Sequence, residues 1–299
     1  MKIHSKKIST LVQRLALSVC LLVLANIAYA QDGDAKQPIK PVKNTFAGNF
    51  LLDNQSVMLP NKGIFEFVIQ HRFGVINNGY KDFYGLYAPS NIRLGFNYAF
   101  HKNVQVGFGF TKERMQWDGN LKLAIVRQSQ IDGAGSPLSI SYYGLMSIDS
   151  RQKKGNFVDN NDRLSYFHQL LFARKITKNF SAQIAPSFSW FNNVEGYISS
   201  DSSVRSKMHN GHFAVSFSGS YAVTSSMSIV ANYDQPLTEH PSNNPHPNLS
   251  LGLQLATSTH TFQIFLSNYQ SIIQQANNMY NQNDYTKWQY LIGFNISKR

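Results

Sequence analysis

Cysteine is almost absent from this sequence, which has one among its 299 residues, at position 20. Cys20 lies in an N-terminal segment that we expect to be removed, so the remaining chain has no thiol. Disulfides and cysteine-ligated metal sites are therefore excluded from the mature protein, whatever the redox state of its compartment. Packing and hydrogen bonds must stabilise it instead.

Long apolar runs are missing after residue 30. The N-terminus itself has a basic head, MKIHSKKISTLVQR, an apolar stretch, LALSVCLLVLANIA, and the small-x-small pattern Ala28-Tyr29-Ala30. These three parts predict a signal peptide at residues 1–30, cleaved after Ala30. A lipoprotein site at Cys20 is disfavoured because the apolar run continues for about ten residues beyond it. No later run approaches the ~18 residues of a membrane helix, so the mature chain is either soluble or crosses a membrane as strands.

Charged residues are also few: they make up 15% of the sequence, and the formal net charge is +12. Lys2, Lys6, Lys7 and Arg14 lie in the predicted signal peptide, which leaves the mature chain at +8. This moderate charge fits contact with acidic lipid or polysaccharide but does not require nucleic acid. We therefore expect outer-membrane lipid among its partners and no nucleic acid.

Alternating apolar and polar residues dominate the chain from residue 64 onward, as in strands with two unlike faces. We predict twelve strands, at residues 64–73, 90–100, 104–113, 119–128, 138–148, 163–176, 180–191, 211–223, 227–235, 247–257, 260–268 and 287–298. Short links such as HKN, TKN and TSS alternate with long ones such as NYQSIIQQANNMYNQNDYTK. This alternation predicts an all-β, closed antiparallel up-and-down barrel with tight turns at one rim and loops at the other.

The segment at 31–63 precedes the predicted barrel, which spans 64–299. Its QPIKPVK stretch is too rich in proline and lysine for a helix or a central strand, whereas FAGNFLLDNQSVMLP has enough apolar residues to dock. We predict a periplasmic lead-in or plug. Whether it enters the barrel or lies against its rim stays open.

The composition of the two strand faces decides which face meets lipid. In NIRLGFNYAF one face carries Ile92, Leu94, Phe96, Tyr98 and Phe100, and the other Asn91, Arg93, Gly95, Asn97 and Ala99. A surface facing water would normally carry many Lys and Glu, whereas small polar residues suit a crowded lumen. Aromatic residues near strand ends, and strands of about ten residues, match a bilayer. We therefore predict a transmembrane barrel in the outer membrane of a Gram-negative cell; the alternative is a soluble lipocalin-like carrier.

NQSVMLPNKG, FVIQHRFG, SNIRLGFNYAF and WDGNLKLAIVRQS, in this order and spacing, resemble an outer-membrane β-barrel family of Bacteroidota whose function is uncharacterised. The resemblance covers most of the mature chain and implies an exported barrel. It assigns no catalytic or binding residue.

Five charged residues share the lumen parity and are placed by strand direction near the outer mouth: Arg72, Arg93, Glu113, Lys122 and Lys287. This mouth cluster predicts either an anion-favouring constriction or a salt-bridged network in a closed lumen. Glu66 has the same parity nearer the periplasm. A lone buried carboxylate is costly, so we expect it to find a partner, such as a lysine of the lead-in segment.

The sequence contains little evidence for metal binding or catalysis. Glu239, His240 and His246 in the stretch EHPSNNPHP match no known metal-site spacing, and we predict a solvated loop with no metal and no cofactor. No Ser/His pair shares the outer face at matching height, so we predict no enzyme.

The favoured function is a narrow channel or uptake barrel for small solutes, anionic ones in particular. The alternatives are a non-conducting structural barrel that binds another envelope protein, and, less favoured, a barrel-embedded hydrolase.

Overall fold

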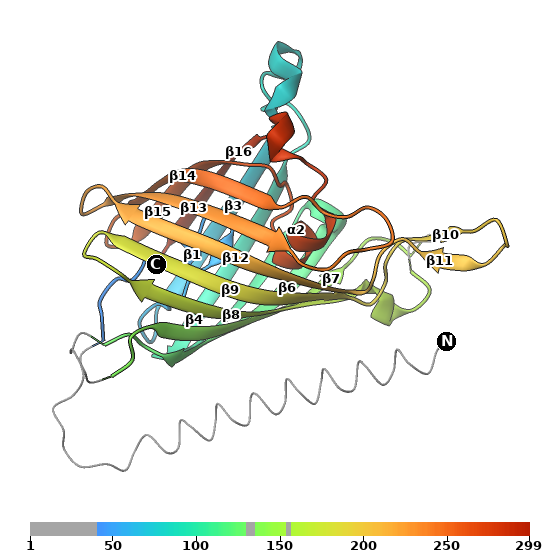
Figure 1. The fold of residues 1–299 in the computed structure, drawn as a ribbon. Coiled ribbons are helices and arrows are strands. Elements are labelled where there is room, and N and C mark those ends of the chain that lie inside the picture. Colours follow the sequence, from blue (N-terminus) through green and yellow to red (C-terminus); the bar gives the residue numbers. More distant parts are fainter. Residues whose placement is uncertain (1–40, 130–134, 154–156) are drawn as a thin grey trace, which may run out of the picture. The chain divides into compact units, whose positions relative to one another are not determined.

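The computed structural model describes residues 41–129, 135–153 and 157–299. The predicted signal peptide and residues 31–40 lie outside this range. Twelve antiparallel strands close into a barrel in the order β12-β13-β14-β15-β16-β3-β4-β5-β6-β7-β8-β9 (Figure 1), which confirms the predicted fold class. No helix among the described residues has the length and apolarity to cross a membrane.

The barrel strands match the predicted ranges closely because the period of two is strict. They are β3 (Phe65–Val75), β4 (Asn91–His101), β5 (Val104–Thr111), β6 (Gln116–Val126), β7 (Ser139–Asp149), β8 (Leu164–Lys175), β9 (Phe180–Phe191), β12 (Gly211–Ala222), β13 (Met227–Pro236), β14 (Asn248–Ala256), β15 (His260–Ser267) and β16 (Leu291–Lys298). The last strand closes against β3, with Leu291 opposite Val75 and Lys298 opposite Phe67.

The last predicted strand begins too early. Residues 285–287 form the 3₁₀-helix η4 (Tyr285–Lys287), and Trp288 after it has φ 61°, in the left-handed region. A left-handed residue breaks the extended backbone that a strand requires. Lys287 therefore lies in a loop and not on the barrel wall.

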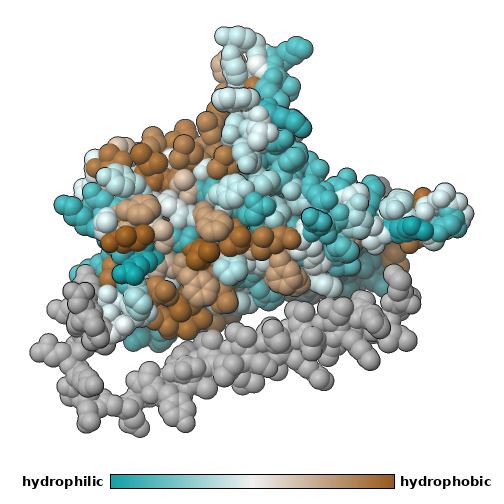
Figure 2. Space-filling view, viewed as in Figure 1, coloured by the Kyte–Doolittle hydropathy of each residue, from teal (hydrophilic) through white to brown (hydrophobic). Residues whose placement is uncertain are grey.

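The side chains divide between the two faces as the alternation predicts. On the outside, Phe213, Leu251 and Ile264 are each 57–59% exposed, and Figure 2 shows apolar residues spread over the strands of the barrel wall. On the inside, serine, asparagine and glutamine are buried; examples are Ser141, Gln183 and Asn232. An apolar outer surface around a polar lumen is the arrangement of a barrel that spans a bilayer.

The two rims differ as expected. Short connections join β4 to β5, β8 to β9, β12 to β13 and β14 to β15; we call this end the turn rim. The opposite end, the loop rim, carries η1 (Ile76–Asp82), η2 (Glu113–Met115), η3 (Asn160–Arg163), η4 and the exposed hairpin of β10 (Gly196–Ile198) and β11 (Val204–Ser206). That hairpin and η1 project from the barrel in Figure 1.

Two further elements lie within the lumen. The first is the N-terminal hairpin, residues 46–58, built around β1 (Phe50–Leu51) and β2 (Asn54–Gln55). The second is α2 (Gln274–Tyr280), in the loop between β15 and β16, where six of seven residues are buried. The sequence did not predict α2, because its amide-rich stretch looked like a solvated loop.

Candidate functional site

The barrel wall binds the backbone of the N-terminal hairpin. Wall amides donate to hairpin carbonyl oxygens: Gln263 Nε2 to Phe50 O at 3.1 Å, Asn295 Nδ2 to Leu52 O at 2.6 Å, and Gln183 Nε2 to Gln55 O at 2.7 Å. Asn232 makes the same contact with Leu51 O. These donors come from four strands around the barrel, so the hairpin lies inside the ring. Buried backbone groups need such partners, since an unpaired one costs about 1–3 kcal/mol.

Side chains of the hairpin also hydrogen-bond to the wall. Asn49 Nδ2 donates to Glu66 Oε2 at 2.6 Å and to Gln105 Oε1 at 3.0 Å, and Asn54 Nδ2 donates to Asp234 Oδ1 at 2.7 Å. Wall carboxylates on β3 and β13 are thus satisfied from inside the lumen.

Asp53 is the point where hairpin, wall and α2 meet. Leu52 before it has φ 60°, and this tight turn places Asp53 at the hairpin tip. The Asp53 carboxylate lies 3.0 Å from Arg72 Nη2 and accepts from Asn277 Nδ2 at 2.7 Å, while Gln274 Nε2 donates to its backbone oxygen at 3.3 Å. A left-handed leucine is a strained conformation, and here it is held by the contacts of the residue that follows.

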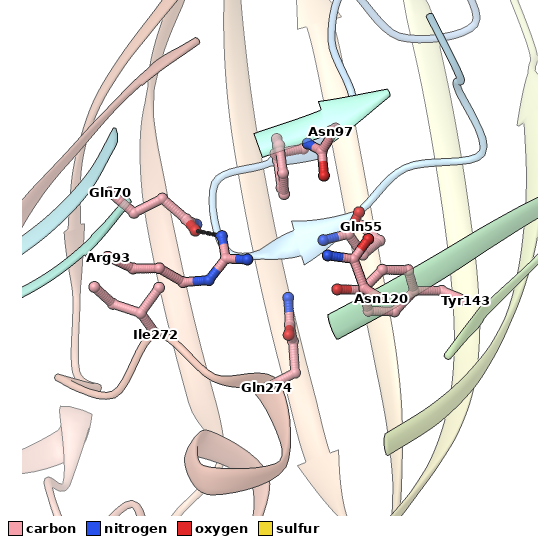
Figure 3. Close-up of a pocket in the computed structure, with 9 residues that line it drawn as sticks. Gln55, Gln70, Arg93, Asn97, Asn120, Tyr143, Ile272 and Gln274 are labelled. Carbon is pink, nitrogen blue, oxygen red and sulfur yellow. Dashed lines mark hydrogen bonds between the residues drawn. The ribbon is translucent and has the colours of Figure 1, made fainter. Parts of the chain in front are cut away.

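Arg93 on β4 pairs with Asp118 on β6, across the intervening strand β5. Its Nε and Nη2 bind the two carboxylate oxygens at 2.8 and 2.6 Å, and Nη1 donates to Gln70 Oε1 at 3.0 Å (Figure 3). A bidentate guanidinium–carboxylate pair is among the strongest neutralising contacts in proteins. Arg93 therefore presents no free positive charge to the lumen.

Lys122 is fully buried and donates to the hairpin carbonyls of Asn49 and Met58, at 3.2 and 3.4 Å. It faces Gln105, the second residue of β5, which begins at the turn rim. Its predicted position at the outer mouth is wrong, because β6 starts at Gln116 and has passed the middle of the wall when it reaches Lys122.

The five residues of the predicted mouth cluster are not gathered at one site. Arg72, Arg93 and Lys122 are buried in the wall, and each has its own partners. Glu113, on η2, is partly buried and accepts from Asn91 and Ser271. The Lys287 side chain is 70% exposed, 3.5 Å from Asp284. The prediction of one contiguous charged sector is therefore wrong, and the five residues make separate polar contacts instead.

Glu66 does have partners, and in the part of the chain that the structure describes the one from the lead-in segment is Asn49 and not a lysine. Arg299 Nε lies 3.1 Å from its Oε1, and Asn97 donates to Oε2 at 3.2 Å. The C-terminal residue thus reaches the turn-rim end of the lumen.

Three acids that neutralise or complete the site were missed from the sequence. Asp118 lies before the predicted start of its strand, and Asp53 lies in a segment with no periodic signal. Asp234 lies in the predicted strand 227–235, at a position whose alternation places it on the lumen face. This alternation could have identified Asp234 as a lumen residue.

The loop helix α2 fills the loop-rim half of the lumen. Gln275 Nε2 donates to Ser147 Oγ at 3.3 Å and Ser165 Oγ at 3.1 Å, and Asn278 Nδ2 donates to Ser187 Oγ at 3.3 Å. Between α2 and the hairpin, beside Arg93 and Tyr143, lies a cavity of ≈10 Å³ (Figure 3). That is about the space of one water molecule, so the middle of the lumen is packed in this conformation.

The histidine loop is organised differently from the predicted solvated loop. His240 is buried, with its Nε2 2.9 Å from His212 Nδ1 of β12, and its Nδ1 accepts from the backbone N–H of His209 at 3.0 Å. Burial and the neighbouring His209 lower the pKa of His240. Within the described part of the chain, no three His, Cys, Asp or Glu side chains are arranged to hold a metal ion.

A family model described as a membrane bound beta barrel domain (DUF5777) matches residues 46–299. No curated protein matches the sequence. Among solved structures, the NanC porin aligns with TM-score 0.46 and 11% identity, covering 78% of this chain and 98% of the porin. The COG4313 outer membrane channel from Pseudomonas putida F1 aligns with TM-score 0.49 and 9% identity, covering 81% and 96%.

Proposed function

The chain belongs to the family of membrane bound beta barrel domains, and on this premise we propose that it is an outer-membrane barrel that passes small solutes, anions preferentially, when the N-terminal hairpin leaves the lumen. The turn rim would face the periplasm and the loop rim the outside. The function is non-enzymatic.

The observation that carries this proposal is that both ends of the hairpin lie at the turn rim. On one side, Val42 N donates to Gln128 O at 2.7 Å, beyond the end of β6. On the other, Gly63 N donates to Ala99 O at 2.6 Å, near the end of β4. A segment whose two ends share one rim can withdraw through that rim without threading the chain through the barrel.

Hydrogen bonds and apolar contacts hold the hairpin in place: Leu51, Leu52 and Val57 belong to one buried cluster with wall residues such as Phe167 and Phe265. Water can replace the hydrogen bonds. Each wall amide that now donates to a hairpin carbonyl would donate to water in an open lumen, so the net cost per bond is about 1 kcal/mol. Apolar lumen walls would not tolerate this exchange. The amide side chains of the wall therefore support a passage that fills with water when the hairpin leaves.

We expect a preference for anions because withdrawal of the hairpin leaves lumen cations without their partners. Withdrawal of the hairpin removes Asp53 from Arg72 and two carbonyl oxygens from Lys122, whereas Arg93 keeps Asp118. Two cations are thus uncovered on β3 and β6. Two carboxylates also lose a hairpin donor: Asp234 on β13 loses Asn54, and Glu66 on β3 loses Asn49 but keeps its ion pair with Arg299. Uncovered cations in a narrow lumen favour anions.

Single-channel current in a planar bilayer tests the proposal. Three proteins are compared: the mature chain, a variant lacking residues 31–63, and that variant with residues 271–283 also replaced by a Gly-Ser linker to remove α2. We expect conductance to rise in this order. Reversal potentials in a salt gradient should show that Arg72→Gln in the open variant lowers the anion preference, whereas Lys112→Gln, an equal charge change on an exposed lysine of the loop rim, does not.

A second function is favoured by the packed lumen itself. With only ≈10 Å³ free beside Arg93, the barrel also suits a non-conducting role in which it binds another envelope protein. Silence in all three proteins, with folded barrels verified by heat-dependent gel migration, would reject the channel and favour this role. Co-purification in mild detergent would then identify the partner.

A further inference from the structure

A second cavity, of ≈410 Å³, lies at the loop rim between the ends of β6, β7, β8 and β9. We call it the vestibule. Its volume falls in the range of small-molecule sites, about 300–1,000 Å³. Arg114, Arg151 and Arg163 line it together with Phe157, Phe191 and Tyr280, the last residue of α2.

The acids of the vestibule already have partners. Asp149 is paired with Arg151 at 2.7 Å, Glu195 with Lys207 at 3.1 Å, and Asp162 Oδ2 accepts two backbone N–H groups. Asp149 and Glu195 are therefore neutralised by cations, whereas Asp162 keeps its negative charge; against Arg114 and Arg163 this leaves one positive charge in excess among the described lining residues.

Two guanidinium groups remain without a carboxylate among the described residues. Arg114 Cζ lies 4.8 Å from the centre of the Tyr280 ring, and Arg163 Cζ lies 4.5 Å from that of Phe157. Arg163 uses Nη1 on two backbone oxygens. Stacking on an aromatic ring orients a guanidinium while its edge stays available to bind an anion.

Gln116 supplies an unpartnered acceptor in the same wall. It is 2% exposed, and its Oε1 has no hydrogen-bond donor within the described ranges. A buried acceptor without a donor is costly, at about 1–3 kcal/mol. A hydroxyl group of a bound solute would satisfy it.

We propose that the vestibule binds a small solute that carries both an anionic group, held by Arg114 and Arg163, and a hydroxyl group that donates to Gln116. Carboxylate and phosphate share the oxygen geometry that a guanidinium recognises. The site rests on the proposed function, since it would be where the barrel collects its solute. Because Tyr280 ends the helix whose Asn277 and Gln274 bind Asp53, the bound solute would lie one helix away from the N-terminal hairpin.

Isothermal titration calorimetry of the full mature protein in a neutral detergent tests this site. The probes are glucuronate, glucose 6-phosphate and glucose. We expect at least one of the two anionic sugars to bind tenfold or more tightly than glucose, and the tighter of the two identifies the anionic group. Arg114→Gln should weaken the anionic probe about tenfold, and Gln116→Ala should weaken it as well.

Arg205→Gln is the matched control, because Arg205 lies on the exposed β10–β11 hairpin and pairs with Asp201. It should leave the affinity unchanged. Equal binding of glucose and both anionic sugars, no heat from any probe, or an equal loss in Arg205→Gln would overturn the site. Binding that depends on Arg114 in a barrel that never conducts would reject the channel function but support the vestibule site. Conduction without binding would support the channel function but reject the vestibule site.

Discussion

Asp53 and Arg72 form an ion pair of 3.0 Å between the tip of the N-terminal hairpin and the barrel wall, with side chains 4% and 0% exposed. Arg72 Nη1 also donates to Asn295 Oδ1 and to the backbone oxygen of His71, and its guanidinium lies 4.6 Å from the centre of the Phe265 ring. The wall thus holds Arg72 through Nη1 and the Phe265 ring. The hairpin contributes the neutralising charge.

Asp53→Asn should loosen the hairpin. Removing one charge of a buried pair leaves the other uncompensated, which typically costs 3–5 kcal/mol. Because Arg72 keeps two other acceptors, we expect about 3 kcal/mol, or roughly a hundredfold faster amide exchange in residues 49–57. Hydrogen–deuterium exchange with mass spectrometry measures this. The control, Asp201→Asn, breaks an exposed pair and should leave exchange in the hairpin unchanged, whereas unchanged exchange in Asp53→Asn would show that the ion pair does not retain the hairpin.

The Arg93–Asp118 pair should behave as one unit. Arg93→Gln and Asp118→Asn should each destabilise the barrel by about 3 kcal/mol, and the double variant by clearly less than the sum, because neither charge is then left alone. Urea unfolding in lipid vesicles measures the four free energies. The exposed pair Arg205–Asp201 gives the comparison, with an expected coupling below about 1 kcal/mol. Additive losses at Arg93 and Asp118 would contradict the bidentate contact.

The strands were predictable because lipid and lumen impose a period of two on every wall residue. Gly107 and Phe108, for example, are adjacent in β5 and lie on opposite faces of the wall. Their different residue types make the two faces visible in the sequence. The start of β6 was less visible: Gln116-Trp117-Asp118 precede the predicted start of the strand at residue 119. This error of three residues hid the partner of Arg93.

The contents of the lumen were not predictable, because they depend on contacts between residues far apart in the chain. The Asn295 amide meets Leu52 O across more than two hundred residues, and no local pattern encodes that pairing. Likewise α2 consists of an amide-rich stretch that would be a solvated loop in isolation. Its Asn and Gln side chains can be buried because the wall serines Ser147, Ser165 and Ser187, and Asp53 of the hairpin, accept their hydrogen bonds.

Gly109→Ala should displace Arg93. A Cβ at Gly109 would overlap the Arg93 guanidinium, and Gly95 on the next strand leaves the same space. Overpacking a tight site costs about 1–3 kcal/mol. Gly119→Ala is the matched control, because nothing lies within 4 Å of the added carbon. Urea unfolding should separate the two variants; equal stability would mean that the guanidinium moves aside freely.

Acidification should release the histidine loop, residues 237–247. Burial and the neighbouring His209 lower the pKa of His240, and its two ring nitrogens contact His209 N and His212 Nδ1. A histidine whose folded-state pKa is depressed contributes stability above its unfolded pKa, near 6.5, and this stability is lost as the pH falls toward the folded value. Hydrogen exchange in the loop, corrected for the intrinsic pH dependence, should therefore be slower at pH 7.5 than at pH 5.

His240→Gln provides the control for this effect. Glutamine keeps an acceptor for the His209 N–H but does not titrate, so its loop should exchange at nearly the same corrected rate at both pH values. His209 and His212 remain in that variant, and their ring centres lie 5.7 and 5.1 Å from that of His240. If His240→Gln retains the full pH dependence of the wild type, one of those two histidines carries the effect and the assignment to His240 is wrong.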